Sequence, residues 1–182
     1  MRSEPPELAF ERVYRANYDR VLAYALCRAD RDQALDATGE TFLVAWRRFG
    51  ELPDEPLPWL LGVARRVIAG QRRTSGRHAA LVTRLAAQPA QPATNDPADQ
   101  VTADSHVAAA LAGLREGDRE VLTLLAWDGL TPAQAAESLG CSRATFAVRL
   151  HRARRRLERE LALAVSNPMT APHPSASIRE VS

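Results

Sequence analysis

The stretch from Thr131 to Arg156, TPAQAAESLGCSRATFAVRLHRARRR, decides the fold of the C-terminal part of the chain. Thr131 offers a hydroxyl cap, a proline occupies the first helical position, and Gln134 stands where a capping box needs its partner. Gly140 can adopt the left-handed conformation that ends such a helix. Because Ser142 then caps another helix after a three-residue turn, the stretch predicts a helix-turn-helix.

The second helix of this motif has an apolar face and a basic face. Its buried stripe is predicted from Phe146 to Leu157, and six arginines lie between Arg143 and Arg156 with no acid among them. An arginine run alone usually indicates only a solvated face, but on the second helix of a helix-turn-helix it favours DNA binding, with phosphate contacts as its main task. The candidate DNA-binding residues here are Ser142, Arg143, Thr145, Val148, Arg149, Arg152 and Arg155.

The composition indicates a globular protein. Hydrophobic residues make up 46% of the 182 residues and charged residues 25%. The net charge of +2 is too small to indicate nucleic-acid binding, so only the distribution of charge is informative. Cys27 and Cys141 lie far apart and outside any metal-ligand spacing, which argues against a disulfide framework, a zinc site or another metal cofactor.

The chain shows no pattern typical of export or of membrane insertion. Acids stand near the N-terminus where a signal peptide has an apolar run, and no stretch approaches 18 continuous apolar residues. We therefore expect a cytoplasmic protein without membrane insertion.

Two small helical domains are predicted. Residues 86–105 contain three prolines and three acids and read as a linker. No alternating strand pattern occurs, so we expect an all-α fold in which the two domains are joined by a flexible linker. The expected divisions are a helical bundle at 5–78, a linker at 79–105, the helix-turn-helix domain at 106–163 and a flexible tail at 164–182.

Helical periodicity organises the N-terminal part. Apolar residues recur at spacings of three and four from Phe10 to Leu26, and Asp30 can cap a second helix. The proline-rich residues 50–58 predict a loop, and a third helix is expected from about Trp59 to Arg73. In the C-terminal part, Asp118 is expected to cap the helix before the helix-turn-helix. Trp46 and Trp59 lie on apolar stripes, which favours core packing over stacking on unpaired bases.

Two segments of the N-terminal part narrow the range of functions that the chain could have. The chain carries ETFLVAW at residues 40–46 and WLLGVAR at residues 59–65, ahead of the helix-turn-helix. Together the segments resemble the two conserved domains of an extracytoplasmic-function sigma factor of bacterial RNA polymerase, over residues 8–77 and 106–163. The resemblance departs from the usual family pattern at Leu35, Gly39, Arg66 and Gly70.

The resemblance implies roles for both domains. In that family the N-terminal domain binds the polymerase clamp and melts the minus-10 promoter element, while the C-terminal domain reads the minus-35 element. By position, the polymerase-binding residues would be Asp36, Glu40 and Phe42. The minus-10 residues would be Arg48, Trp59, Arg65, Arg66, Arg72 and Arg73, and residues 65–77 hold five arginines and no acid.

Of three functions that the sequence leaves open, the first is the one we expect and the other two are its rivals. The first is a non-enzymatic sigma factor whose partners are core RNA polymerase, promoter DNA and an anti-sigma factor. The second is a stand-alone helix-turn-helix transcription regulator. The third is a protein-interaction module whose basic faces bind an acidic partner. The chain contains no phosphate-binding glycine loop, nucleophile elbow or HExxH motif, so no catalytic residue is predicted.

Overall fold

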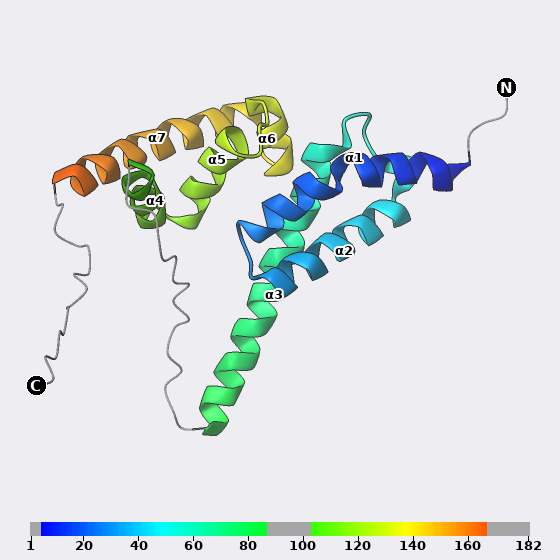
Figure 1. The fold of residues 1–182 in the computed structure, drawn as a ribbon, viewed down its shortest axis with the longest axis horizontal. Helices are drawn as coiled ribbons and strands as arrows, with labels where there is room; N and C mark the ends of the chain where they lie inside the picture. The colour runs from blue at the N-terminus through cyan, green and yellow to red at the C-terminus, as the bar shows by residue number, and fades with distance from the viewer. Residues whose placement is uncertain (1–4, 87–102, 167–182) are drawn as a thin grey trace, which may run out of the picture.

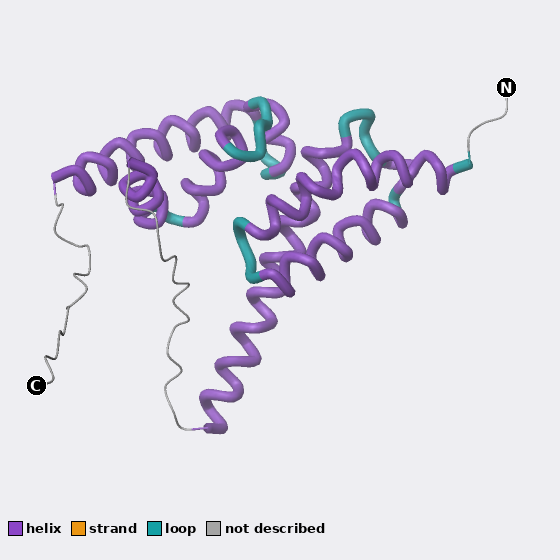
Figure 2. The backbone as a smooth tube through the Cα atoms, viewed as in Figure 1, coloured by secondary structure: helices purple, strands orange, loops and turns teal. Residues whose placement is uncertain are grey.

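The computed structural model describes residues 5–86 and 103–166, and both ranges are built from helices joined by short loops (Figures 1 and 2). The expected all-α fold is confirmed, with no strand in the ranges described. The elements are α1 (Pro6–Leu26), α2 (Arg31–Arg47), a 3-10 helix η1 (Phe49–Glu51), α3 (Pro56–Ala86), α4 (Ala103–Gly113), α5 (Glu116–Ala126), α6 (Pro132–Ser138) and α7 (Arg143–Ser166).

Helices α1, α2 and α3 form the N-terminal bundle. Each of the three packs against the other two, and their shared core includes Val21, Ala34, Phe42 and Leu60. Asp30 caps α2 as expected, because its carboxylate accepts a hydrogen bond of 2.9 Å from the backbone N–H of Gln33.

Helix α3 is longer at both ends than the sequence predicts. It begins at Pro56, inside the expected loop. Proline is tolerated in the first helical turn because a backbone N–H there has no hydrogen-bond acceptor within the helix, so the helix loses no hydrogen bond where proline lacks an N–H. Helix α3 continues beyond Arg73 to Ala86, since no proline occurs between Pro58 and residue 89. Figure 1 shows the C-terminal half of α3 extending away from the bundle. The first eight residues of the expected linker are therefore helical, and residues 87–102 lie outside the described ranges.

Helices α4 to α7 form the C-terminal domain, in which α7 packs against the other three. Asp118 does not cap α5, contrary to expectation. The capping position is held by Arg115, which makes no side-chain cap, and Asp118 lies in the first turn, where it pairs with Arg156 of α7. Helix α7 continues to Ser166, so the expected tail begins later than predicted, and residues 167–182 lie outside the described ranges.

The two domains are packed against each other through α3 and α6. A single cluster of buried side chains includes Tyr24 and Leu61 from the bundle and Val121, Leu130 and Ala135 from the C-terminal domain. No helix in the described ranges is long and apolar enough to cross a membrane.

Candidate nucleic-acid interface

The helix-turn-helix has the local geometry that its sequence predicts. The hydroxyl of Thr131 accepts a 3.3 Å hydrogen bond from the N–H of Gln134, whose side chain accepts a 2.9 Å bond from the N–H of Thr131. Gly140 has a φ of 63°, the left-handed conformation of the turn. The hydroxyl of Ser142 accepts a 3.1 Å hydrogen bond from the N–H of Thr145 and so fixes the start of α7.

The outer face of α7 is basic and exposed. Phe146 and Ala153 are buried on the inner face, and every candidate residue from Ser142 to Arg155 is exposed to solvent. Val148 is 51% exposed among these arginines, an apolar side chain of the kind that contacts a thymine methyl group in a major groove. This face therefore combines guanidinium, hydroxyl and apolar groups on one rigid helix.

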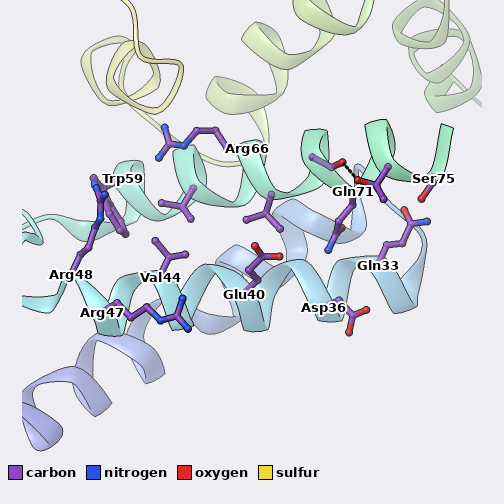
Figure 3. Close-up of a pocket in the computed structure, with 14 residues that line it drawn as sticks. Gln33, Asp36, Glu40, Val44, Arg47, Arg48, Trp59, Arg66, Gln71 and Ser75 are labelled. Carbon is purple, nitrogen blue, oxygen red and sulfur yellow. Dashed lines mark hydrogen bonds between the residues drawn. The ribbon is translucent and has the colours of Figure 1, made fainter. Parts of the chain in front are cut away.

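A groove of about 890 Å³ runs between α2 and α3 (Figure 3). Asp36 and Glu40 lie on its α2 side, and Trp59 and Arg66 lie on its α3 side, with Arg48 near the end at which Trp59 lies. The structure thus brings two of the three predicted polymerase-binding residues to the same groove as three of the predicted minus-10 residues. The α2 side carries both acids and arginines, while Arg66 is the charged residue that the α3 side contributes to the lining.

Phe42, the third predicted polymerase-binding residue, is buried. Only 4% of it is exposed, and its ring centroid lies 4.7 Å from that of Tyr14, so it supports α2 from inside. The expectation that Trp46 packs in the core is wrong, because Trp46 is 41% exposed and its ring makes an edge contact with Phe10 at the bundle surface. Trp59 is partly buried against the core, as expected.

Four of the predicted minus-10 arginines, including Arg66, line a second cavity that faces the C-terminal domain. Arg65, Arg66, Arg72 and Arg73 of α3 line a cavity of about 500 Å³ together with Arg149 of α7. Arg72 is already engaged, because it pairs with Glu116 of α5 and donates a hydrogen bond to the carbonyl oxygen of residue 28. Residues predicted to contact two separate promoter elements therefore lie around one cavity.

A partly buried polar cluster joins the domains. Arg28, at the end of α1, forms ion pairs of 2.8 Å with Glu120 and 3.2 Å with Asp128, and it donates a 2.8 Å hydrogen bond to Thr123. Tyr24 donates a 2.6 Å hydrogen bond to Glu120, and its ring centroid lies 3.6 Å from the guanidinium carbon of Arg28. Sequence reasoning missed this cluster, because nothing in the local pattern links residues that are about a hundred positions apart.

Burial changes the pKa values of the ionisable groups in this cluster. Desolvation raises the pKa of the Tyr24 phenol, and the carboxylate of Glu120 raises it further. Desolvation also raises the pKa of Asp128, although the charge of Arg28 opposes the rise. Burial by itself lowers the pKa of Arg28, but Glu120 and its other partners outweigh burial and the net direction is upward. The cluster is therefore a charged network.

No group of three or more histidine, cysteine, aspartate or glutamate side chains in the described part of the chain could hold a metal ion. The arrangement offers exposed surfaces for binding.

Comparison with known proteins identifies relatives of one kind. Residues 106–157 match the family model "Sigma-70, region 4". The chain is 35% identical over 154 residues to the ECF RNA polymerase sigma factor SigL of Mycobacterium tuberculosis, covering 80% of this chain and 86% of SigL. It is 30% identical over 163 residues to the ECF sigma factor SigK of Mycolicibacterium vanbaalenii, covering 84% of this chain and 83% of SigK. It is also 34% identical to the probable RNA polymerase sigma factor RfaY of Xanthomonas campestris, but it spans only 40% of that protein's length.

Two solved structures share the fold. A chain in the co-crystal structure of the sigma factor RpoE with the anti-sigma factor NepR from Bartonella quintana aligns with a TM-score of 0.64 at 24% identity, over 85% of this chain and 98% of that chain. A chain in the structure of CnrH with the cytosolic domain of CnrY aligns with a TM-score of 0.56 at 23% identity, over 86% of this chain and 90% of that chain.

Proposed function

The chain belongs to the family of extracytoplasmic-function RNA polymerase sigma factors, and on that premise we propose that it binds core polymerase and directs initiation at promoters with minus-35 and minus-10 elements. The chain supplies recognition and strand opening, while the chemistry of RNA synthesis belongs to the polymerase. The observation that carries the proposal is the exposed basic face of α7 within a fully capped helix-turn-helix.

The C-terminal domain is proposed to read the minus-35 element. Recognition helices of this kind insert their N-terminal residues into the major groove. Ser142, Arg143 and Thr145 occupy that end of α7, and Arg152 and Arg155 lie about two and about three turns beyond Thr145, where the phosphate backbone would pass.

The groove between α2 and α3 is proposed to serve the polymerase and the minus-10 element. Asp36 and Glu40 present carboxylates that suit a basic protein surface. Arg48, Arg66 and the edge of Trp59 present groups that suit an opened DNA strand, because guanidinium groups bind phosphates and indole rings stack on bases. Phe42 would act indirectly by holding α2 in place.

The direct test is run-off transcription with purified core polymerase on the DNA upstream of this protein's own gene. A specific transcript that appears only when the chain is added supports the proposal. Core binding is measured in the same samples by co-purification, with the double variant Asp36→Lys and Glu40→Lys expected to bind weakly. The matched double variant Asp19→Lys and Asp54→Lys reverses two exposed acids outside the groove and controls for net charge.

A chain that neither binds core polymerase nor yields a transcript contradicts the proposal and favours a stand-alone regulator. Because RpoE was crystallised in complex with an anti-sigma factor, we also propose that this chain binds such a partner. Co-purification with a candidate anti-sigma protein co-expressed with the chain, followed by the same run-off assay, tests that expectation.

A further inference from the structure

We propose that Val148 of α7 selects one base of the minus-35 element, by packing its methyl groups against the C5-methyl group of a thymine. The inference rests on the proposed function, in which α7 enters the major groove, and it adds the identity of a base that this helix selects.

Val148 lies at the centre of the exposed face of α7. At about 100° per residue, its side chain is turned about 200° from the buried Phe146 and about 140° from the buried Ala153. Leu150, which packs against the core, lies on the same inner side of the helix. Val148 therefore points away from the body of the domain and toward whatever the helix binds.

The neighbours of Val148 leave it a close approach to the floor of a groove. Ala144, one turn earlier on the same face, is exposed and short, so it does not hold the helix away from the DNA. Arg152 lies one turn later, and Arg149 lies on the flank of the face. The first two turns of the outer face thus include an apolar strip of Ala144 and Val148, with arginines beside it and beyond it.

The hydroxyl groups at the start of α7 are engaged in its cap. The hydroxyls of Ser142 and Thr145 share a hydrogen bond of 2.9 Å, and Ser142 also accepts the bond from the N–H of Thr145. A hydroxyl that holds a cap has less hydrogen-bonding capacity left for a base edge. Val148 is the next side chain along this face that is available to contact a base.

A valine side chain suits one group in the major groove. Thymine presents a C5-methyl group there, whereas the distinguishing groups of the other three bases are hydrogen-bond donors and acceptors. Valine has no polar atom, so against a donor or acceptor it displaces water without replacing the lost hydrogen bond. Against the thymine methyl group it removes apolar surface from water on both sides. The same side chain therefore favours thymine and disfavours the alternatives.

The stiffness of valine strengthens this contact. A single exposed apolar residue is common on protein surfaces, so exposure alone carries no argument. In a helix, however, valine keeps one χ1 rotamer in about 90% of cases, so its methyl groups are ordered before binding. Valine also has a lower helix propensity than alanine, so helix stability does not favour it at an exposed position. Val148, at 51% exposure, is thus a rigid apolar contact that the fold does not require.

The test removes the methyl groups from each side of the contact in turn. Holoenzyme is reconstituted from the full chain and core polymerase, and its affinity for the promoter fragment that gives the run-off transcript is measured by fluorescence anisotropy. Synthetic duplexes replace each thymine of the minus-35 region, on either strand, by deoxyuridine, which lacks only the C5-methyl group. Val148→Ala removes the γ-methyl groups from the protein. Leu163→Ala is the matched control, because Leu163 is another apolar side chain of α7, 63% exposed and beyond the candidate DNA-binding residues.

We expect one thymine at which deoxyuridine weakens binding of the unmodified holoenzyme about fourfold, the effect of removing about one methyl group of buried apolar surface. Holoenzyme with Val148→Ala should bind the thymine and deoxyuridine forms of that position equally, whereas Leu163→Ala should keep the difference. Alanine is the better helix former, so Val148→Ala should not unfold the domain. Each comparison is made within one variant, so a general loss of affinity cannot produce the expected result.

Equal binding of the thymine and deoxyuridine forms at every minus-35 position by the unmodified holoenzyme would overturn the inference. So would a deoxyuridine effect that persists in Val148→Ala, because another group then contacts the methyl, and so would a minus-35 element without a T·A pair. A chain with neither core binding nor a transcript loses both the proposed function and this inference. A chain that gives a transcript but is insensitive to methyl removal keeps the proposed function and loses this inference alone.

Discussion

Nε of Arg28 lies 2.8 Å from Oε2 of Glu120, an ion pair between residues 92 positions apart that links the turn after α1 of the bundle to α5 of the C-terminal domain. Both side chains are shielded, at 13% and 14% exposure. Screening by water and salt is therefore weaker here than at the surface, and removing one partner leaves the other charged in a poorly hydrated site. This pair couples the stability of the two domains.

The first prediction concerns the phenol that shares this pair. Tyr24→Phe keeps the buried ring beside Arg28 but removes the 2.6 Å hydrogen bond to Glu120. Because the acceptor is a charged group, the variant should lose about 1.5 to 3 kcal/mol of unfolding free energy, measured by urea titration. Tyr14→Phe, at a ring that is 38% exposed, should change it by less than about 0.5 kcal/mol. Equal effects of the two substitutions would contradict the role given to the Tyr24 hydroxyl.

The second prediction concerns pH. Desolvation raises the pKa of Asp128 above its ordinary value of 3.8, against the opposing charge of Arg28. A carboxyl group whose pKa is higher in the folded chain binds its proton more readily when folded. Its contribution to stability is therefore fully present below the unfolded pKa and falls as the pH rises through the folded pKa. Unmodified chain should gain stability relative to Asp128→Asn as the pH falls from neutral through the raised pKa of Asp128 to its ordinary value of 3.8.

Urea titrations of both proteins across this range provide the measurement. Asp54→Asn, at an exposed loop position, serves as the control, and its unfolding free energy should depend on pH as that of the unmodified chain does. Parallel stability profiles for the unmodified chain and Asp128→Asn would show that burial does not govern the titration of this group.

The sequence predicts local features well. Thr131, Gly140 and Ser142 act on their own neighbours in the chain, and each adopts the role that its residue type and spacing indicate. The helical stripes and the cap at Asp30 were also predictable, because a helix is stabilised by contacts three and four residues apart.

Features that depend on distant contacts were not predictable. The long extension of α3 past Arg73 and the replacement of a cap at Asp118 by an ion pair to Arg156 depend on surroundings that a local pattern does not contain. From the sequence alone, Gly62 is a residue of low helix propensity inside a helix. Its close approach to Ser138 of α6 becomes apparent only when the two helices are packed together. The placement of the two arginine groups around one cavity is likewise a property of domain packing.

The third prediction compares alanine substitutions at two glycines of the C-terminal domain, which should change its unfolding free energy in opposite directions. Gly140→Ala forces a side chain into the left-handed region at φ 63° and should cost about 1 to 2 kcal/mol of unfolding free energy. Gly117→Ala lies in helix α5, with no atom within 4 Å of the added methyl group, and should stabilise by up to about 1 kcal/mol. Thermal melts should therefore shift in opposite directions. A shift of the same sign in both would contradict the turn geometry assigned to Gly140.

The fourth prediction concerns the recognition helix. Replacing Arg149 and Arg152 together by glutamine removes two exposed guanidinium groups from the outer face of α7 without disturbing the buried Phe146 and Ala153. Affinity for a promoter fragment should fall at least about tenfold, since a phosphate or base contact by arginine contributes about 1 to 3 kcal/mol. If both arginines contact phosphates, the slope of the logarithm of the binding constant against the logarithm of the salt concentration should become less negative by about 2.

Filter binding or fluorescence anisotropy at several salt concentrations measures both quantities. Arg159→Gln, beyond the candidate DNA-binding residues near the end of α7, is the matched control and should retain the original slope. Loss of affinity with an unchanged slope would assign the two arginines to base edges instead of phosphates, because base contacts release no condensed counterions. Unchanged affinity in the double variant would place the recognition surface elsewhere on the domain and remove the main support for the minus-35 assignment.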